Sequence, residues 1–281
     1  MRTIFKQRVF SVPVPFTDEK NVSTEPVIDA EPLLEVRHLT MKYNRRVIQQ
    51  NLDFRICRGQ VFVIMGGSGC GKSTLLRHLT GLQKPASGEV WFEGENFWKL
   101  TASRRDDLMR QAGVLFQRSG LWSSMTLAEN IALPLREYTS YSAAEIRELC
   151  EWKLSLVGLA GFGGYYPSEI SGGMQKRAGL ARAIALDPKV VFFDEPSAGL
   201  DPVNASRLDD LILELRESLG ATVVVVTHEL ASIFAIADEA IFLDGLSKTI
   251  IARGKPRDLK DNSQNPTVRE FLTRRGKSGG L

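Results

Sequence analysis

Short apolar segments alternate with helical patterns along most of this chain. Gln60–Met65 is uniformly apolar after its first residue and predicts a buried strand, and Leu34–Arg37 alternates like a half-buried one. The leucines of Ser73–Leu82 then recur at helical spacing. Later apolar runs that predict strands are Lys189–Phe193, Thr222–Thr227 and Glu239–Leu243. Because strands alternate with helices, we expect an α/β fold with a mainly parallel sheet covered on both faces.

The alternation stops in the middle of the chain. Between about Leu121 and Ser168 no segment has a convincing strand pattern, whereas Ser142 and Glu145 have the spacing of a capping box. Apolar residues follow that box at helical spacing. We therefore expect a helical subdomain, about 121–180, inserted into an α/β core that spans 33–260.

Both ends of the chain differ from this core. Prolines and small polar residues fill 1–32, which we expect to be an extended N-terminal segment, and two prolines in Phe10–Phe16 argue against a signal-peptide core. In 261–281 we expect a short amphipathic helix, Pro266–Arg275, and a loose tail. Earlier, Asn204–Leu219 predicts a longer amphipathic helix that Gly220 ends.

Composition and charge exclude several classes of protein. The 281 residues carry 36 Lys+Arg and 33 Asp+Glu, a formal net charge of +3, without a basic block, so nucleic acid is not an expected partner. Mean hydropathy is −0.11 and no apolar run approaches ~18 residues, so no membrane-spanning helix is expected. Three cysteines and three histidines, without paired spacing, predict neither a disulfide framework nor a metal centre built from them.

The glycine-rich segment after the first buried strand carries the clearest chemistry. Gly66–Ser73 fits the phosphate-binding pattern G-x-x-x-x-G-K-[ST] between a predicted strand and a predicted helix. Its backbone N–H groups and the helix N-terminus favour phosphate, Lys72 is expected to reach the β- and γ-phosphates, and Ser73 to hold Mg²⁺. The alternative is a glycine-rich turn with an incidental lysine, which the flanking elements disfavour.

The phosphate loop suggests a function for two further segments. Two acids, Asp194 and Glu195, end an apolar strand. They are either a solvated pair or, beside a phosphate loop, a Mg²⁺ carboxylate followed by a residue that polarises the attacking water. Ser171, Gly172 and Gly173 precede a helix and are either a turn and cap or a second anion site. Since the chain already has one phosphate loop, that second site would serve a nucleotide held by another copy.

The ordered motifs together resemble the ATP-binding subunit of ABC transporters, from about Leu33 to Asp258. Gly66–Ser73 is similar to the Walker A loop, Val190–Glu195 to the Walker B strand, and Ser171–Gly173 to the family signature. Ser197–Asp201 resembles the D-loop. The resemblance implies a P-loop NTPase (RecA-like) core with an antiparallel β edge near the N-terminus, and ATP and Mg²⁺ as cofactors.

The same resemblance implies roles for single residues. Tyr43 resembles the aromatic that stacks on adenine, Gln117 the Q-loop glutamine, and His228 the switch histidine. Glu195, His228 and Gln117 would be catalytic, and the metal site would be Ser73, Gln117 and Asp194. Residues implied to contact ATP are Tyr43, Gly66, Gly67, Ser68, Gly69, Cys70, Gly71, Lys72, Ser73, Thr74, Ser171, Gly172, Gly173 and Asp201.

One position departs from the family pattern. The commonest signature reads Leu-Ser-Gly-Gly-Gln, whereas this chain has Met174 where the glutamine stands and Gln175 one place later. The serine and glycines that face phosphate are intact. What the departure puts in doubt is which side chain contacts the sugar of the partner's nucleotide.

Three classes of function compete within this family. ABC ATPases of translation usually carry two cassettes, and those of DNA repair place long heptads between Walker A and signature, here 171 − 72 = 99 residues without a coiled coil. The motor subunit of a membrane transporter fits better. Its expected partners are a second copy of itself, in a head-to-tail dimer around ATP, and a separate permease. Its expected place is peripheral, at the cytoplasmic face of the inner membrane.

Subfamily features favour one kind of transporter. Ser171–Met174 with Lys176–Ala178, Asp194–Pro202, Val225–Phe234 and Val268–Leu272 resemble the Mla-type, MCE-associated ATPases that move phospholipids between bacterial membranes. That resemblance implies lipid transport and an MCE-domain partner. The alternative is the ATPase of an ABC importer for a small polar solute, which shares every catalytic motif.

Overall fold

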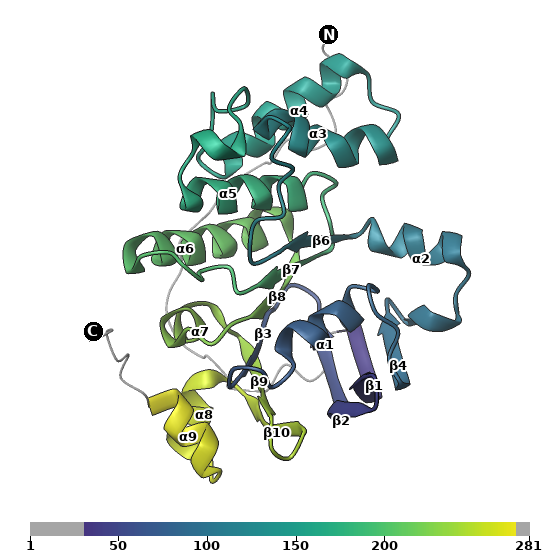
Figure 1. Ribbon diagram of the computed structural model, residues 1–281, viewed down its shortest axis with the longest axis vertical. Coiled ribbons are helices and arrows are strands. Elements are labelled where there is room, and N and C mark those ends of the chain that lie inside the picture. The colour runs from purple at the N-terminus through teal and green to yellow at the C-terminus, as the bar shows by residue number, and fades with distance from the viewer. Residues whose placement is uncertain (1–30, 274–281) are drawn as a thin grey trace, which may run out of the picture. The chain divides into compact units, whose positions relative to one another are not determined.

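The computed structural model describes residues 31–273 (Figure 1). The expectations for 1–30 and for the tail after residue 273 lie outside the described residues. Pro32 is the first residue of the strand β1 (Pro32–Tyr43). The domain boundaries themselves stay predictions.

A six-stranded sheet forms the centre of the fold. Its strand order is β10-β9-β3-β8-β7-β6, and all neighbours pair in parallel except the antiparallel β9–β10 edge. The mainly parallel sheet expected from the sequence is therefore confirmed. The strands are β3 (Val61–Gly66), β6 (Ala112–Leu115), β7 (Val190–Asp194), β8 (Thr222–Val226), β9 (Glu239–Asp244) and β10 (Thr249–Gly254).

A second sheet confirms the antiparallel edge near the N-terminus. Its order is β2-β1-β4-β5, with every pair antiparallel. Several register shifts interrupt β1 and β2, so their alternation is irregular and the sequence pattern revealed only Leu34–Arg37 of this sheet. The strands are β1 (Pro32–Tyr43), β2 (Arg46–Cys57), β4 (Ser87–Phe92) and β5 (Glu95–Asn96).

Helices cover the parallel sheet, and two of them occupy the stretch without strands. In Figure 1, α3 and α4 lie beyond α5 on the side away from α8 and α9. The helices are α1 (Lys72–Leu79), α2 (Ala102–Met109), α3 (Leu127–Tyr138), α4 (Ala143–Leu156), α5 (Gly172–Ala183), α6 (Pro202–Leu219), α7 (Leu230–Ile236), α8 (Pro256–Asn262) and α9 (Pro266–Thr273), with short 3₁₀ turns at Phe97–Lys99 and Pro167–Glu169.

Local signals read from the sequence explain several helix ends. Ser142 accepts from the Glu145 N–H while the Glu145 carboxylate accepts from the Ser142 N–H, so the predicted capping box is confirmed. Gly220 ends α6 in the left-handed conformation that glycine adopts without strain. Thr126 and Glu129 form a second capping box, at α3. Each box satisfies N–H groups that a helix N-terminus otherwise leaves unpaired.

The parallel sheet is buried on both faces, and β3 shows this directly. Phe62 and Ile64 belong to a hydrophobic cluster with α1 and the antiparallel sheet. Val61, Val63 and Met65 belong to another, with α3 to α7 and α9. Alternate residues of a strand point to opposite faces, so β3 contributes to both clusters. α1 is thereby packed on the face that also meets the antiparallel sheet.

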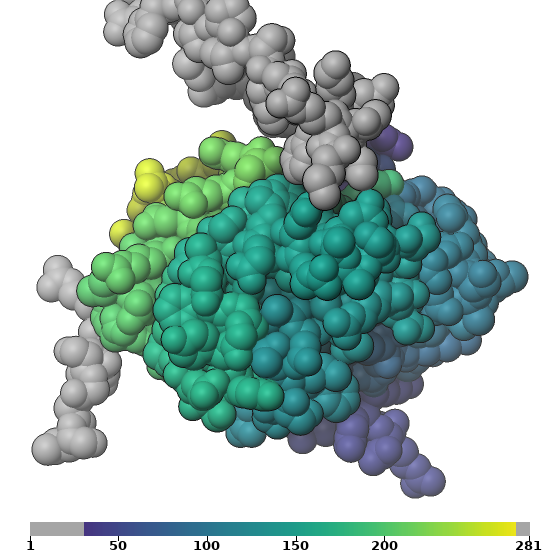
Figure 2. All heavy atoms as spheres, turned by 90° about the horizontal axis from the view of Figure 1, so that it is seen from above, coloured from purple at the N-terminus to yellow at the C-terminus, as the bar shows by residue number. Residues whose placement is uncertain are grey.

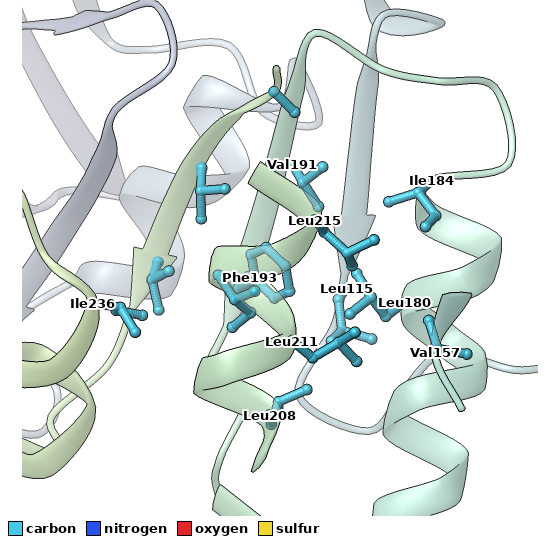
Figure 3. Close-up of a cluster of buried hydrophobic side chains, with 14 of the residues drawn as sticks. Leu115, Val157, Leu180, Ile184, Val191, Phe193, Leu208, Leu211, Leu215 and Ile236 are labelled. Carbon is cyan, nitrogen blue, oxygen red and sulfur yellow. The ribbon is translucent and has the colours of Figure 1, made fainter. Parts of the chain in front are cut away.

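The helical stretch shares its core with the sheet. In Figure 3, Val157, just after α4, lies near Leu180 of α5 and Leu115 of β6 in the same cluster as Phe193 of β7. Figure 2 shows the teal surface of this stretch between the green surface of the later helices and the blue surface around α2. Each fully buried aliphatic side chain there stabilises the fold by about 1.5–3 kcal/mol.

A buried histidine at the end of α1 makes stability depend on pH. His78 is fully buried and its Nδ1 donates to Gln83 O at 2.6 Å, while Nε2 has no partner. Burial lowers the pKa of this imidazole below 6.5. Below about pH 6.5, His78 binds a proton in the unfolded chain but not in the folded chain. The free energy of unfolding therefore falls as the pH drops below that value.

We expect His78→Gln, whose neutral amide can still donate to Gln83 O, to remove this contribution. Between pH 7.5 and 5.5 the wild-type chain should lose about 1 kcal/mol more unfolding free energy than the variant does. Urea denaturation at the two pH values measures both losses. If both proteins lost the same unfolding free energy, the fold would not lower the pKa of His78.

Candidate nucleotide site

The carboxyl ends of four neighbouring parallel strands bring the predicted site residues together. β3 leads into Gly66–Ser73, β7 ends at Asp194, β8 ends at Val226 before His228, and β6 ends at Leu115 before Gln117. Parallel neighbours end at the same edge of a sheet, which is where ligands bind in open α/β folds. Segments more than a hundred residues apart in sequence thus meet at one edge.

The phosphate loop has a backbone that only glycine permits at two positions. Gly66 has φ +150°, and a Cβ there would lie 2.3 Å from Leu243 O. Gly71 has φ +106°, and a Cβ there would lie 2.7 Å from Ile48 Cγ2. Side chains at these positions would push the loop away from β9 and β2. Both glycines are therefore required for the loop to lie against the two sheets.

The helix that follows the loop has a free N-terminus. Gly71 is the N-cap residue of α1 and, as a glycine, makes no side-chain cap hydrogen bond, and the first turn holds no acidic residue. Lys72 is buried, and its Nζ donates to Gly66 O at 3.0 Å and Gly67 O at 3.1 Å. Unpaired N–H groups, the helix dipole and an ammonium together make this end of α1 a site for an anion.

A buried glutamine that belongs to no sequence motif connects this loop to a neighbouring strand. Gln49 of β2 is fully buried, and its amide nitrogen donates to Cys70 O at 2.7 Å and to Asp244 O at 2.9 Å. It links the loop to the end of β9. Nothing in the sequence marked it, because its partners are main-chain carbonyls of segments distant along the chain.

The two acids at the end of β7 point into the site and have different partners. Asp194 Oδ1 accepts from Ser73 Oγ at 2.8 Å. The Glu195 carboxylate is nearly buried and lies 2.9 Å from His228 Nδ1 through both oxygens, and 4.0 Å from Lys72 Nζ. Because a carboxylate only accepts, Nδ1 of His228 carries the proton. The structure therefore brings together Lys72, Ser73, Asp194, Glu195 and His228.

The remaining predicted residues surround this cluster with fewer contacts. Tyr43, at the end of β1, is 70% exposed, and Gln117 is exposed after β6. Ser68 and Gly69 are exposed in the phosphate loop, and Thr74 is half-buried in the first turn of α1. These positions leave the side chains free for a ligand. Whether they contact ATP stays a prediction.

The signature segment caps the helix that follows it. Ser171 is the N-cap of α5, and its hydroxyl accepts from the Met174 N–H at 3.3 Å. The cap interpretation is confirmed, and Ser171 and Gly172 are also exposed, so a second role is open to them. Asp201 likewise caps α6 through the N–H groups of Val203 and Asn204. Hydrogen bonds from Asn204 hold the pKa of the Asp201 carboxyl below its usual range.

This combination of loop, strand ends and uncapped helix defines a P-loop nucleotide-binding protein. The family model described as ABC transporter matches residues 49–198. The chain belongs to that family: it is the ATP-binding, ATP-hydrolysing subunit of an ABC transporter.

Named relatives and solved structures agree with this membership. The chain is 41% identical over 240 residues to "Intermembrane phospholipid transport system ATP-binding protein MlaF" of Escherichia coli (strain K12), covering 85% of this chain and 88% of that protein. It is 40% identical over 242 residues to "Probable ribonucleotide transport ATP-binding protein mkl" of Mycobacterium tuberculosis (strain ATCC 25618 / H37Rv), covering 86% and 67%. A dimeric post-hydrolysis structure of the ATP-binding cassette MJ0796, bound to ADP and Pi, matches with a TM-score of 0.72 at 30% identity and covers 79% of this chain and 98% of that one.

Within residues 31–273, no helix combines the length and the apolar character that crossing a membrane requires.

The thiol in the phosphate loop gives a test of the loop's packing. Cys70 is 4% exposed, and burial raises the pKa of its thiol despite the nearby Lys72 charge. We expect N-ethylmaleimide at pH 7.5 to label the partly exposed Cys57 well before Cys70. Inhibition of ATPase activity should follow Cys70 labelling, and ATP should slow it.

Mass spectrometry of peptides from a labelling time course measures both rates. Labelling of Cys70 as fast as that of Cys57 would contradict a buried loop thiol. Inhibition that ATP does not slow would contradict a nucleotide contact near Cys70.

Proposed function

We propose that the phosphates of ATP bind between the phosphate loop and the N-terminus of α1, with adenine on Tyr43. The buried Lys72 ammonium donates to two neutral carbonyls, and anionic β- and γ-phosphate oxygens are stronger acceptors. Gly66, Gly67, Ser68, Gly69, Cys70, Gly71, Ser73 and Thr74 contribute backbone N–H groups or side chains around them. The uncapped first turn of α1 supports this arrangement.

The proposed metal site fits magnesium. Ser73 Oγ and Asp194 Oδ1 are oxygen donors 2.8 Å apart beside the phosphate loop, and Gln117 lies at the end of the neighbouring strand β6. Mg²⁺ binds one or two protein oxygens and completes its octahedron with phosphate oxygens and water. When bound there, it would neutralise charge that develops on the phosphates during transfer.

Glu195 is the proposed general base. Its carboxylate accepts from His228 Nδ1–H and lies 4.0 Å from the Lys72 ammonium, so both groups flank it at the edge where the γ-phosphate would lie. It would orient water and take its proton, while His228 and Lys72 face the γ-phosphate. Gln117 would help to orient the same water. The single observation that carries this mechanism is the Glu195 carboxylate between Lys72 and His228.

A second copy completes the proposed site. Ser171, Gly172 and Gly173 begin α5 at an exposed helix N-terminus and would close over the γ-phosphate held by the partner, with Asp201 near the dimer contact. The post-hydrolysis structure of the relative MJ0796 is dimeric and bound to ADP and Pi, which supports this arrangement. Met174, in place of the usual glutamine, is expected to alter only the contact to the sugar.

We expect Glu195→Gln to lower kcat by roughly 10²-fold or more, because the amide cannot take the proton of water. ATP should still bind, so the variant should accumulate as an ATP-bound dimer. Phosphate release and size-exclusion chromatography with ATP and Mg²⁺ measure the two effects. Glu217→Gln, on the exposed side of α6, is the matched control and should keep wild-type kcat. Turnover by Glu195→Gln at the wild-type rate would exclude Glu195 as the base.

The proposed docking site for the permease is a groove between α2, β6, α3 and α5. Its volume is about 690 Å³, and its lining includes Leu133, Pro134 and Tyr138 of α3 with Met109 and Arg110 from the α2 side. Leu133 and Tyr138 remain 38% and 49% exposed, so apolar surface is available to a helix from a membrane subunit. Such docking would place the chain at the cytoplasmic face of the inner membrane.

We expect Leu133→Glu to abolish co-purification of the permease while the purified chain hydrolyses ATP at the wild-type rate. A docked apolar helix would remove the introduced carboxylate from water, which is costly for a charged group. Leu246→Glu is the matched control, since Leu246 lies in the turn between β9 and β10 and is 93% exposed. Pull-down of the tagged chain from detergent-solubilised membranes, with mass spectrometry, measures the partner. Equal recovery with both variants would exclude the groove as the docking site.

The proposed cargo is phospholipid, moved between bacterial membranes with an MCE-domain partner. The similarity to MlaF over 85% of this chain carries this proposal. The second candidate is a small polar solute, which the similarity to mkl, named for ribonucleotide transport, favours. The same pull-down separates them: an MCE-domain protein with bound phospholipid supports the first, and a periplasmic solute-binding protein supports the second.

A further inference from the structure

A buried lysine in the signature helix lies against the backbone of the proposed base. Lys176 of α5 is 7% exposed, and its Nζ donates to the main-chain carbonyl of Glu195 at 3.2 Å. Burial lowers the pKa of this ammonium, which the nearby Glu195 charge partly offsets. Burial of an ammonium is costly. If the Lys176 side chain only filled space in the core, an apolar side chain would stabilise the fold more.

The Glu195 backbone is held in a conformation that a residue with a Cβ rarely adopts. Its φ is +48°, in the left-handed region. Three hydrogen bonds surround that strained unit: the Glu195 N–H donates to Val226 O at 2.8 Å, and the Glu195 carbonyl accepts from the Ala198 N–H and from Lys176 Nζ, both at 3.2 Å. A strained backbone persists where its surroundings fix it, and Lys176 supplies one of these contacts from another element.

The conformation has a consequence for the side chain. On this backbone, the Glu195 carboxylate lies 2.9 Å from His228 Nδ1 and 4.0 Å from Lys72 Nζ. A different φ at Glu195 would move its Cβ, and the carboxylate with it, relative to both groups. The position of the proposed base therefore depends on the groups that bind its carbonyl.

We propose that Lys176 is a positioning residue that ties the signature helix α5 to the backbone of Glu195. This inference rests on the proposed function of Glu195 as the base. In the proposed dimer, the N-terminus of α5 faces the nucleotide of the partner, whereas Glu195 acts on the nucleotide of its own subunit. Movement of α5 when it meets the partner's γ-phosphate is then passed through Lys176 to Glu195, which couples the two ATP sites.

A second buried lysine provides the matched control. Lys153 of α4 is fully buried, and its Nζ pairs with Asp187 Oδ1 at 2.5 Å on the loop between α5 and β7. It contacts none of the proposed site residues. Replacement of either lysine by methionine removes a buried ammonium and keeps most of the stem, so the two variants differ in the partner they lose.

The experiment compares Lys176→Met, Lys176→Arg and Lys153→Met in the full-length chain. Steady-state ATP hydrolysis gives kcat, KM and the Hill coefficient for ATP, thermal unfolding confirms the fold, and fluorescence titration with a labelled ATP analogue gives the Kd. We expect Lys176→Met to lower kcat about tenfold or more and to bring the Hill coefficient toward 1, with Kd within about twofold of the wild type. Lys176→Arg, which retains a long donor, should restore most of kcat, and Lys153→Met should leave kcat and the Hill coefficient unchanged.

Three results would overturn the inference. They are wild-type kcat and Hill coefficient for Lys176→Met, an equal loss of kcat for Lys153→Met, and a loss for Lys176→Met that appears only as weaker ATP binding. Glu195→Gln separates this inference from the proposed function. If that variant loses turnover and Lys176→Met does not, only the coupling fails. If Glu195→Gln retains turnover, the proposed base fails, and the role of Lys176 with it.

Discussion

Parallel strands carry their carboxyl ends to the same edge of a sheet, and here four neighbouring strands each lead into a part of the nucleotide site. β3 delivers the phosphate loop, β7 delivers Asp194 and Glu195, β8 delivers His228, and β6 delivers Gln117. No contact among these side chains forms unless the register of β3, β8 and β7 is correct. Burial of both sheet faces fixes that register, because a shift by one residue would exchange the two sets of apolar side chains.

Local patterns in the sequence were sufficient for much of the fold. The uniformly apolar runs predicted β3, β7, β8 and β9 within one or two residues, and the Ser142 capping box and Gly220 marked helix ends. The strands β2, β4, β5, β6 and β10 are not predicted. β2 is interrupted by register shifts and β6 has only four residues, so neither offers a long enough periodicity.

The residues of the candidate site also fall into two groups, those that sequence motifs predict and those that they do not. Lys72, Ser73, Asp194 and Glu195 stand in motifs whose spacing is itself the signal, and the structure brings them together. The sequence does not mark Gln49, and it marks Lys176 only within a subfamily resemblance and without a role. Each side chain acts on a main-chain carbonyl, and residue types do not show where a carbonyl lies. The sequence also does not predict the left-handed backbone of Glu195, whose hydrogen bonds include contacts with β8 and α5, far away in the sequence.

The core that α3, α4 and α5 share with the parallel sheet limits how the helical stretch can move. Val157, Leu180, Leu115 and Phe193 belong to one continuous packed layer, so a hinge that opened a gap there would expose several fully buried side chains at once. Sliding of interdigitated side chains by an ångström or so avoids that cost and is the shear type of domain motion. A conformational change in this fold would then be transmitted as many small rotamer adjustments across the core between the helices and the parallel sheet.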